Sequence, residues 1–147
     1  VVGAAAALAI HDPPLIIIDM GTATTMTVID REARVLGGAI IPGVGISLEA
    51  LANGTSQLPH ISLDAPKKCI STDTVEAMRS GSVYGTAAML DGMIERMEAE
   101  LGEPAAVIAT GGLGGCIIPY CRREITYDKN LLLNGLWALY QKNKRKR

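Results

Sequence analysis

The strongest constraint on the fold of this chain is a short apolar run that leads into an acidic turn. Residues 15–18 (Leu-Ile-Ile-Ile) have the length and branched side chains of a fully buried strand. The run continues into Asp-Met-Gly-Thr at positions 19–22, and a second β-branched segment follows at Thr24–Ile29. A turn at residues 30–32 leads to a third candidate strand, Val35–Ile41. Three strands joined by such short turns predict an antiparallel meander.

Helical and strand patterns alternate on either side of this meander. An Ala-rich helix is expected at residues 1–10, packed closely against the sheet, whereas residues 55–71 have an extended, irregular pattern. A long helix is predicted after Thr72, taken as its N-cap, with a bend or a close helix contact near Gly81 and a stop at Gly102. The remaining predictions are a helix at Gly45–Leu51 that stops at Asn53-Gly54, a strand at Ala105–Ala109, a short helix, a strand at Ile125–Tyr127 and a last helix at Lys129–Lys142.

This order of elements resembles the ribonuclease-H-like half-domain of the actin, hexokinase and Hsp70 group of ATP-handling proteins. The resemblance implies an α/β fold in which a mixed sheet, with the three-stranded meander at its start, is flanked by helices. A length of 147 residues is suited to one such domain. Fold order alone does not establish the chemistry, which has to come from particular residues.

Charge and cysteine content exclude several classes of partner. The net charge of −1 gives the chain no field that favours nucleic acid or an anionic membrane, and no segment reaches the ~20 apolar residues of a membrane span. Five of the six residues at 142–147 are basic, which we interpret as a solvated tail. Cys69, Cys116 and Cys121 form no CxxC pair, so they predict neither a disulfide framework nor a zinc site. A reducing, cytoplasmic setting fits best.

The turn at residues 19–25 carries the sharpest chemical signal. Asp19 at a strand end can hold a cation or its waters, and Gly21 permits backbone N–H groups to approach a phosphate closely. The hydroxyl of Thr22 adds a donor without adding charge. An ordinary hairpin with Gly in its turn and Thr as strand filler explains the same residues equally well.

Two glycine-rich segments are weaker signals. A predicted strand feeds Thr110-Gly111-Gly112 and then a helix, an arrangement that offers unhindered amides to a nucleotide phosphate. It matches neither a Walker loop nor the dinucleotide fingerprint, and Gly-Gly at such a junction is often only packing. Gly37-Gly38 and Pro42-Gly43 flank the third strand, where they allow close approach of a ligand or another backbone, or a bulge and a turn.

The start of the long helix is the last candidate, and several other residues are discounted. Thr72-Asp73-Thr74 offers two hydroxyls and helix-start amides to a small carboxylate or hydroxyl-rich substrate, although plain capping is the simpler interpretation. His11 and His60 form no nucleophilic triad. Residues interpreted as core or subunit interface are Met78, Met89, Met93 and Met97, and those interpreted as a solvated face are Glu95, Glu98 and Glu100.

The motifs taken together resemble those of the type III pantothenate kinases. They are Asp19-x-Gly-Thr-Ala-x-Thr, Gly37-Gly-x-Ile-x-Pro-Gly, Thr74 before Ala77-Met78-x-x-Gly81, Thr110-Gly-Gly and Leu132-Leu133-x-Gly135-Leu136. The resemblance runs from Ile16 to about Tyr140. It implies ATP-dependent phosphorylation of pantothenate to 4'-phosphopantothenate, the first step of coenzyme A biosynthesis.

The resemblance also implies roles for individual residues. Asp19 matches the family's ligand for a monovalent cation, potassium or ammonium. Gly21 and Thr22 match its ATP contacts, and Gly111 with Gly112 lies on the nucleotide side. Thr74 matches the threonine that binds pantothenate. ATP is expected as its Mg²⁺ complex, and the family forms homodimers with active sites near the subunit interface, for which the Met-bearing long helix is suited.

The sequence departs from the family in one major respect. The Asp-x-Gly-Asn-Thr phosphate motif and the Gly-x-Asp-Arg motif, whose aspartate is the general base, are not in this sequence. The family's spacing places the base immediately before Val1, so we expect the second half of a two-domain kinase, inactive by itself, and nominate neither Asp12 nor Asp30 as the base. A non-catalytic nucleotide-binding or regulatory relative is the main alternative. Another kinase or a phosphatase of the superfamily is a third.

Overall fold

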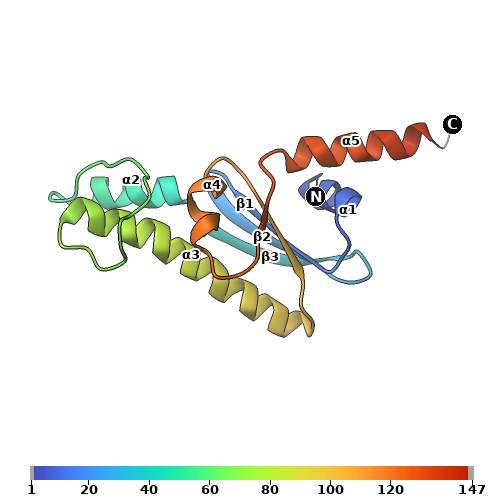
Figure 1. Cartoon of the computed structure of the whole chain (residues 1–147), viewed down its shortest axis with the longest axis horizontal. Coiled ribbons are helices and arrows are strands. Elements are labelled where there is room, and N and C mark those ends of the chain that lie inside the picture. Colours follow the sequence, from blue (N-terminus) through green and yellow to red (C-terminus); the bar gives the residue numbers. More distant parts are fainter. Residues whose placement is uncertain (1, 146–147) are drawn as a thin grey trace.

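A single mixed sheet organises the chain, as the computed structural model in Figure 1 shows. Residues 2–145 are described, so Val1 and the last two residues of the basic tail, 146–147, lie outside the described residues. The five strands are hydrogen-bonded in the order β3-β2-β1-β4-β5. The elements are α1 (Val2–Ile10), β1 (Leu15–Met20), β2 (Ala23–Ile29), β3 (Val35–Pro42), α2 (Val44–Gly54), α3 (Thr74–Leu101), β4 (Ala106–Thr110), α4 (Gly114–Ile117), a 3-10 turn (Ile118–Tyr120), β5 (Thr126–Tyr127) and α5 (Leu131–Lys144).

The predicted meander is confirmed, and a parallel pairing completes the sheet. β1 runs antiparallel to β2 with Leu15 opposite Ile29, and β2 runs antiparallel to β3. On its other edge β1 pairs parallel with β4, so that Ile17 lies opposite Ile108. The fold is therefore the expected mixed sheet flanked by helices, with the three-stranded meander at its start. Parallel pairing brings the carboxyl ends of β1 and β4 to the same edge of the sheet.

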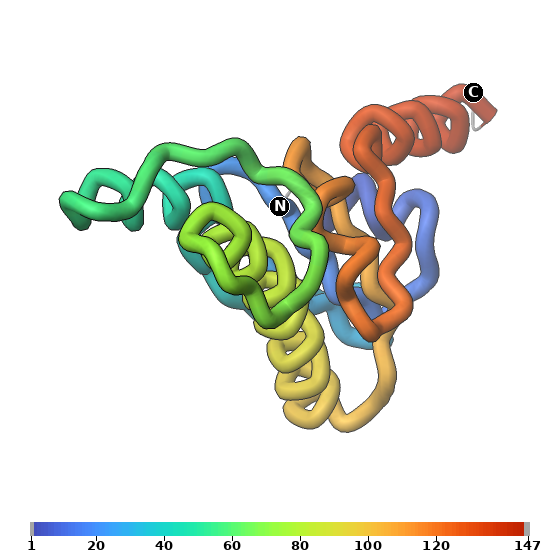
Figure 2. The backbone as a smooth tube through the Cα atoms, turned by 60° about the vertical axis from the view of Figure 1, so that its left-hand side comes forward, coloured from blue at the N-terminus to red at the C-terminus, as the bar shows by residue number. Residues whose placement is uncertain are grey.

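Side chains of β1 alternate between two apolar layers. Ile16 and Ile18 face α3 and pack with Val83 and Leu90 in the larger core. Leu15 and Ile17 face the other way, and they pack with a set drawn from α1, β2, β4 and α5 that consists of Ala4, Ala7, Ile29, Ile108 and Leu131. Successive side chains of a strand point to opposite faces of the sheet, and both sets are buried here. The sheet is therefore covered on both faces at β1. Figure 2 shows α3 and α5 on opposite sides of the strands.

The long helix differs from its prediction at its beginning and along its glycines. Asp73, not Thr72, is the N-cap, because its carboxylate accepts a hydrogen bond from the Glu76 N–H at 3.0 Å. Gly102 ends the helix in the left-handed conformation, as expected. Among residues 2–145, no close helix contact is formed at Gly81: a Cβ placed there would meet no heavy atom within 4 Å.

Two polar interactions correct the remaining predictions for the helices. Glu98 does not belong to a solvated face, because its carboxylate accepts from Arg123 at 2.6 and 2.7 Å and from the Ala105 N–H at 3.0 Å. The last helix starts at Leu131 rather than Lys129, because the Asp128 carboxylate accepts from the Asn130 N–H and holds a turn there. At the end of α2, Thr55 rather than Gly54 is the C-cap.

The Ala-rich first helix packs closely against α5 as well as the sheet. Gly135 is required at that crossing, since a Cβ there would overlap the backbone and side chain of Ala6. Ala7 is fully buried in the same region. Within residues 2–145, none of the helices combines the length and apolar character needed to cross a membrane.

Candidate functional site

Asp19 and Thr110 are neighbours at the carboxyl ends of the parallel pair β1–β4. Their Cα atoms are register partners, and both strands end within one residue of this point. Asp19 is exposed, whereas the strand residues before it are buried. Open α/β sheets bind ligands at the carboxyl ends of their strands. The fold therefore brings together the acidic turn and the glycine loop, which are 91 positions apart in the sequence.

The two glycines of the loop after β4 have different structural roles. Gly111 has φ +101°, and a Cβ there would lie 2.6 Å from backbone atoms of Met20. The Tyr127 hydroxyl donates to the Gly111 carbonyl at 2.7 Å. In contrast, a Cβ at Gly112 would meet nothing within 4 Å. Gly111 is thus needed for packing, and Gly112 is the position with open space for a ligand.

Gly38 and Gly43, at β3 and just after it, allow close backbone approach, whereas a Cβ at Gly37 would meet nothing within 4 Å. A Cβ at Gly38 would collide with the Met26 carbonyl of β2, and one at Gly43 would collide with the Thr22 carbonyl. Gly43 therefore allows α2 to begin directly beside the Asp19–Thr22 turn. In that turn the Gly21 N–H already donates to the Ala23 carbonyl at 3.2 Å, and the side chains of Asp19 and Thr22 are exposed.

A cavity of about 250 Å³ lies where β1, β4 and the start of α5 meet. Asp19, Thr110, Gly111 and Gly112 line it, together with Lys129 and Asn130 before α5. Sequence reasoning missed these last two residues. The available signal was Lys129, a basic residue two positions after the end of β5, at the same end of the sheet as the glycine loop.

A second cavity of about 310 Å³ continues from Asp19 between the sheet and the helices α1 and α5. Thr25 and Thr27 of β2 and Thr110 of β4 supply hydroxyl groups to its wall. Asp19 borders both cavities. It is the one carboxylate among the residues lining these two cavities. Among residues 2–145, no cluster of three or more His, Cys, Asp or Glu suited to a metal occurs.

This oxygen-rich set fits a weakly held monovalent cation better than a tightly held divalent one. Hard cations take oxygen ligands, and tight protein sites for divalent ions combine several of them. Here one carboxylate, from Asp19, stands beside the hydroxyl-bearing Thr110 and Thr25.

Thr74 lies in a different cavity, between α2 and α3. This cavity has a volume of about 570 Å³, and no residue lines both it and the cavities at Asp19. Thr74 contributes a hydroxyl, as do Ser82 and Thr86, and Leu51 and Met78 contribute apolar wall. Thr72 does not line it. The structure therefore keeps the Thr74 part of the predicted helix-start site and separates it from the Asp19 turn.

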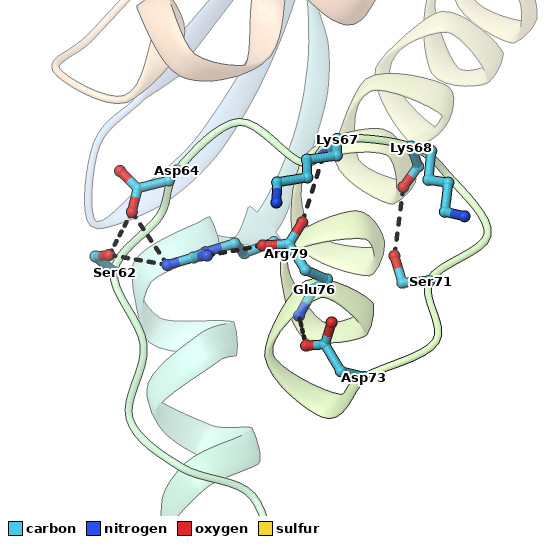
Figure 3. Close-up of polar contacts among 8 residues, drawn as sticks. All are labelled: Ser62, Asp64, Lys67, Lys68, Ser71, Asp73, Glu76 and Arg79. Carbon is cyan, nitrogen blue, oxygen red and sulfur yellow. Dashed lines mark hydrogen bonds and ion pairs between the residues drawn. The ribbon is translucent and has the colours of Figure 1, made fainter.

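The first turns of α3 also carry a network of charged groups. Arg79 donates to Glu76 at 2.8 Å and to Asp64 at 3.2 Å, as Figure 3 shows. The hydrogen bond from Arg79, helped by the Lys67 N–H, lowers the pKa of the Glu76 carboxyl below its usual value. The segment before α3 is thus tied to the helix beside Thr74.

Comparison with known proteins shows similarity to the type III pantothenate kinases. The sequence profile of the type III pantothenate kinase family matches residues 1–96. A type III pantothenate kinase of Exiguobacterium sp. is 45% identical over 145 residues, which cover 99% of this chain and 57% of that protein. One of Rhodospirillum rubrum is 42% identical over 97% of this chain and 55% of that protein. The chain spans about half the length of the curated relatives that it matches.

Solved structures show the same fold. A crystal structure from Campylobacter jejuni, titled as a Baf family transcriptional activator, has a TM-score of 0.63 and 25% identity, covering 96% of this chain and 63% of that one. The ethanolamine utilization protein EutJ of Carboxydothermus hydrogenoformans has a TM-score of 0.54 and 18% identity, covering 93% of this chain and 52% of that one. At that identity the second likeness concerns the fold alone.

Proposed function

Because the chain belongs to the type III pantothenate kinase family, we propose that the protein containing it transfers the γ-phosphoryl group of ATP to pantothenate, giving 4'-phosphopantothenate for coenzyme A biosynthesis. The observation that carries this proposal beyond family membership is the juxtaposition of Asp19 with Thr110 and its glycine loop. It supplies an acidic cation ligand and an open phosphate approach at one edge of the sheet.

Each residue of this edge has a proposed task in binding ATP. Thr22 donates its hydroxyl, and Gly112, with no neighbour within 4 Å of a Cβ, lets the nucleotide approach the backbone. Gly21, where a Cβ would meet only ordinary contacts, lets ATP approach the acidic turn, and Gly111 holds the shape of the loop after β4. Phosphoryl transfer is accelerated mainly by positioning and charge neutralisation, so well-placed donors suffice. ATP is taken as its Mg²⁺ complex.

Asp19 is proposed to hold the monovalent cation, potassium or ammonium. Its carboxylate is exposed to both cavities at the strand ends, beside the hydroxyl of Thr110. A cation there neutralises part of the negative charge of the phosphoryl groups. Lys129, which lines the same cavity, adds positive charge from the chain itself.

Thr74 is proposed to hydrogen-bond pantothenate. Its cavity has hydroxyl groups from Ser82 and Thr86 beside apolar wall from Leu51 and Met78. Pantothenate carries a carboxylate, an amide, hydroxyls and two methyl groups, a mixture that matches such a wall. Binding sites of this kind combine apolar lining with a few polar groups that fix orientation.

The chain by itself is proposed to be inactive. The Thr74 cavity and the cavities at Asp19 share no residue, and we assign the general base, an aspartate that accepts the pantothenate hydroxyl proton, to the remainder of the protein. A homodimer in the cytoplasm is part of the same proposal.

The test compares the native full-length protein with the 147-residue chain. Each is incubated with ATP, Mg²⁺, K⁺ and pantothenate, and 4'-phosphopantothenate is measured by mass spectrometry. We expect product from the full-length protein and none from the chain. Formation of 4'-phosphopantothenate by the chain alone would contradict the proposal that the chain is inactive without the remainder of the protein.

A second candidate is a regulatory protein that binds nucleotide without phosphorylating pantothenate. The likeness to the Campylobacter jejuni structure, titled as a transcriptional activator, favours it. Binding of ATP by the full-length protein without formation of 4'-phosphopantothenate would support this candidate against the first. Phosphorylation of a sugar or acetate instead would point to another enzyme of the superfamily.

A further inference from the structure

The segment between α2 and α3 has little structure of its own. Within residues 56–72, all of them described, the one backbone–backbone hydrogen bond joins the Asp64 N–H to the Ser62 carbonyl at 3.1 Å. Pro66 is the one buried residue in this stretch, and Leu63 is partly buried against the core. Figure 2 shows the segment passing around the N-terminal end of α3. With so few apolar contacts, its position depends on side-chain hydrogen bonds to the helix.

Arg79 supplies the largest share of those bonds. Its guanidinium donates to Asp64 Oδ2 at 3.2 Å and to Ser62 Oγ at 3.5 Å on the segment, and to Glu76 Oε1 at 2.8 Å on its own helix (Figure 3). Glu76 in turn accepts from the Lys67 N–H at 3.4 Å. The Arg79 side chain is only 22% exposed, although Asp64 is 64% exposed.

This arrangement is oriented toward the segment and not toward the Thr74 cavity. Thr74, Ala77, Met78 and Gly81 of α3 line the cavity, whereas Arg79 does not. The Arg79 guanidinium is instead directed to Ser62 and Asp64 of the segment. The segment nevertheless reaches the cavity, because Leu58 forms part of its wall.

We propose that Arg79 is a positioning residue for the pantothenate site. By joining Asp64 and Ser62 to the first turns of α3, it fixes the segment that closes one side of the Thr74 cavity, and it acts on substrate affinity without touching substrate. This inference rests on the proposed function, in which Thr74 binds pantothenate. Hydrogen bonds from a charged donor are stronger than neutral ones, and the Arg79 side chain that donates these is mostly buried.

The experiment measures steady-state kinetics of the native full-length protein with Arg79→Met. We expect the KM for pantothenate to rise about tenfold, as expected for loss of one charge-assisted hydrogen bond, while the KM for ATP changes less than about twofold. Arg79→Lys, which keeps the charge but only part of the contacts, should fall between. Arg31→Met is the matched control, because Arg31 pairs with Glu103 at 3.0 Å at the opposite end of α3.

A structural readout accompanies the kinetics. Trypsin cleavage after Lys67 and Lys68, followed by mass spectrometry, should be faster in Arg79→Met than in wild type and unchanged in Arg31→Met. If Arg79→Met does not fold, Asp64→Ala serves as the second variant, because it removes the hydrogen bond between Arg79 and Asp64 by changing the more exposed partner. It should give the same rise in the KM for pantothenate.

Two results would overturn the proposal. One is an unchanged KM for pantothenate in a folded variant whose segment is cleaved faster. The other is an equal rise in both KM values, which indicates general damage. Failure of the wild-type protein to phosphorylate pantothenate is a distinct result that overturns the proposed function itself and, with it, the substrate assigned here. In either case, cleavage of Arg79→Met after Lys67 and Lys68 at the wild-type rate would refute the link between Arg79 and the segment.

Discussion

Asp19 and Thr110 lie opposite each other at the ends of two parallel strands, β1 and β4. The first belongs to the acidic turn and the second begins the glycine loop, so one register pair unites two motifs that are distant in the sequence. This pair carries the proposed nucleotide and cation site.

The Asp19 carboxylate is expected to be needed for activation by a monovalent cation. In the native full-length protein, Asp19→Asn should weaken activation by K⁺ about tenfold or more, since one charged ligand is worth at least ~1.4 kcal/mol. Asp12→Asn is the control, because Asp12 is exposed and lines neither of the two cavities at Asp19, and it should leave activation by K⁺ unchanged. Equal K⁺ titrations of wild type and Asp19→Asn would refute the cation role.

Thr74 and Thr72 form a matched pair on either side of the helix cap. Thr74→Ala should raise the KM for pantothenate about three- to tenfold, the effect of one neutral hydrogen bond of about 0.5–1.5 kcal/mol. Thr72→Ala should not, because Thr72 does not line the cavity. The KM for ATP should stay the same in both. If the two variants have the same KM for pantothenate, the proposal that Thr74 binds pantothenate is wrong.

Substitutions at Gly111 and Gly112 are expected to distinguish a role in packing from a role in ligand access. Gly111→Ala should destabilise the protein by more than ~2 kcal/mol, because Gly111 has a positive φ and a Cβ there would lie 2.6 Å from the Met20 backbone. Gly112→Ala should change stability by less than about 1 kcal/mol and raise the KM for ATP. Urea unfolding and ATP kinetics measure the two effects. Equal destabilisation by both substitutions would contradict this division.

The Glu98–Arg123 pair predicts an acid-sensitive contribution to stability. The hydrogen bond from Arg123, with that from the Ala105 N–H, lowers the pKa of Glu98 below 4.5 in the folded protein. Folding then favours the ionised form, so the contribution is complete above about pH 4.5, the unfolded value, and is lost as the pH falls through the lower folded value.

Urea unfolding across the acidic range measures that contribution. Glu98→Gln should lower the free energy of unfolding by about 1 kcal/mol at pH 7 and by progressively less at lower pH. Glu95→Gln, at an exposed position of the same helix, is the control. A Glu98→Gln effect that does not depend on pH would mean that the ion pair contributes nothing.

Cys121 is expected to be the slow thiol of the three. Burial, with a smaller effect of the Asp91 charge, raises its pKa from 9.0 to about 12, which lowers the thiolate fraction about a thousandfold at neutral pH. Cys69 and Cys116 are exposed. Iodoacetamide at pH 8 should label those two first and Cys121 far more slowly, a difference that guanidinium denaturation should abolish. Equal rates in the native protein would contradict the burial of Cys121.

The sequence by itself determined the elements and the order of the motifs. The apolar run of β1, the β-branched residues of β2 and the left-handed Gly102 cap are local signals, and each depends on neighbours within a few positions. Even here the N-cap was misassigned by one residue, because Thr72 and Asp73 are both good caps and only the hydrogen bond to Glu76 distinguishes them.

Tertiary structure decided which distant residues meet. The partner of Glu98 is 25 positions away, and Lys129 reaches the Asp19 cavity only because β5 pairs with β4. Thr74 stays apart from Asp19 because α2 and α3 form their own cavity. No local pattern encodes such contacts, since they arise when both faces of the sheet are covered by helices whose packing fixes the loops between them.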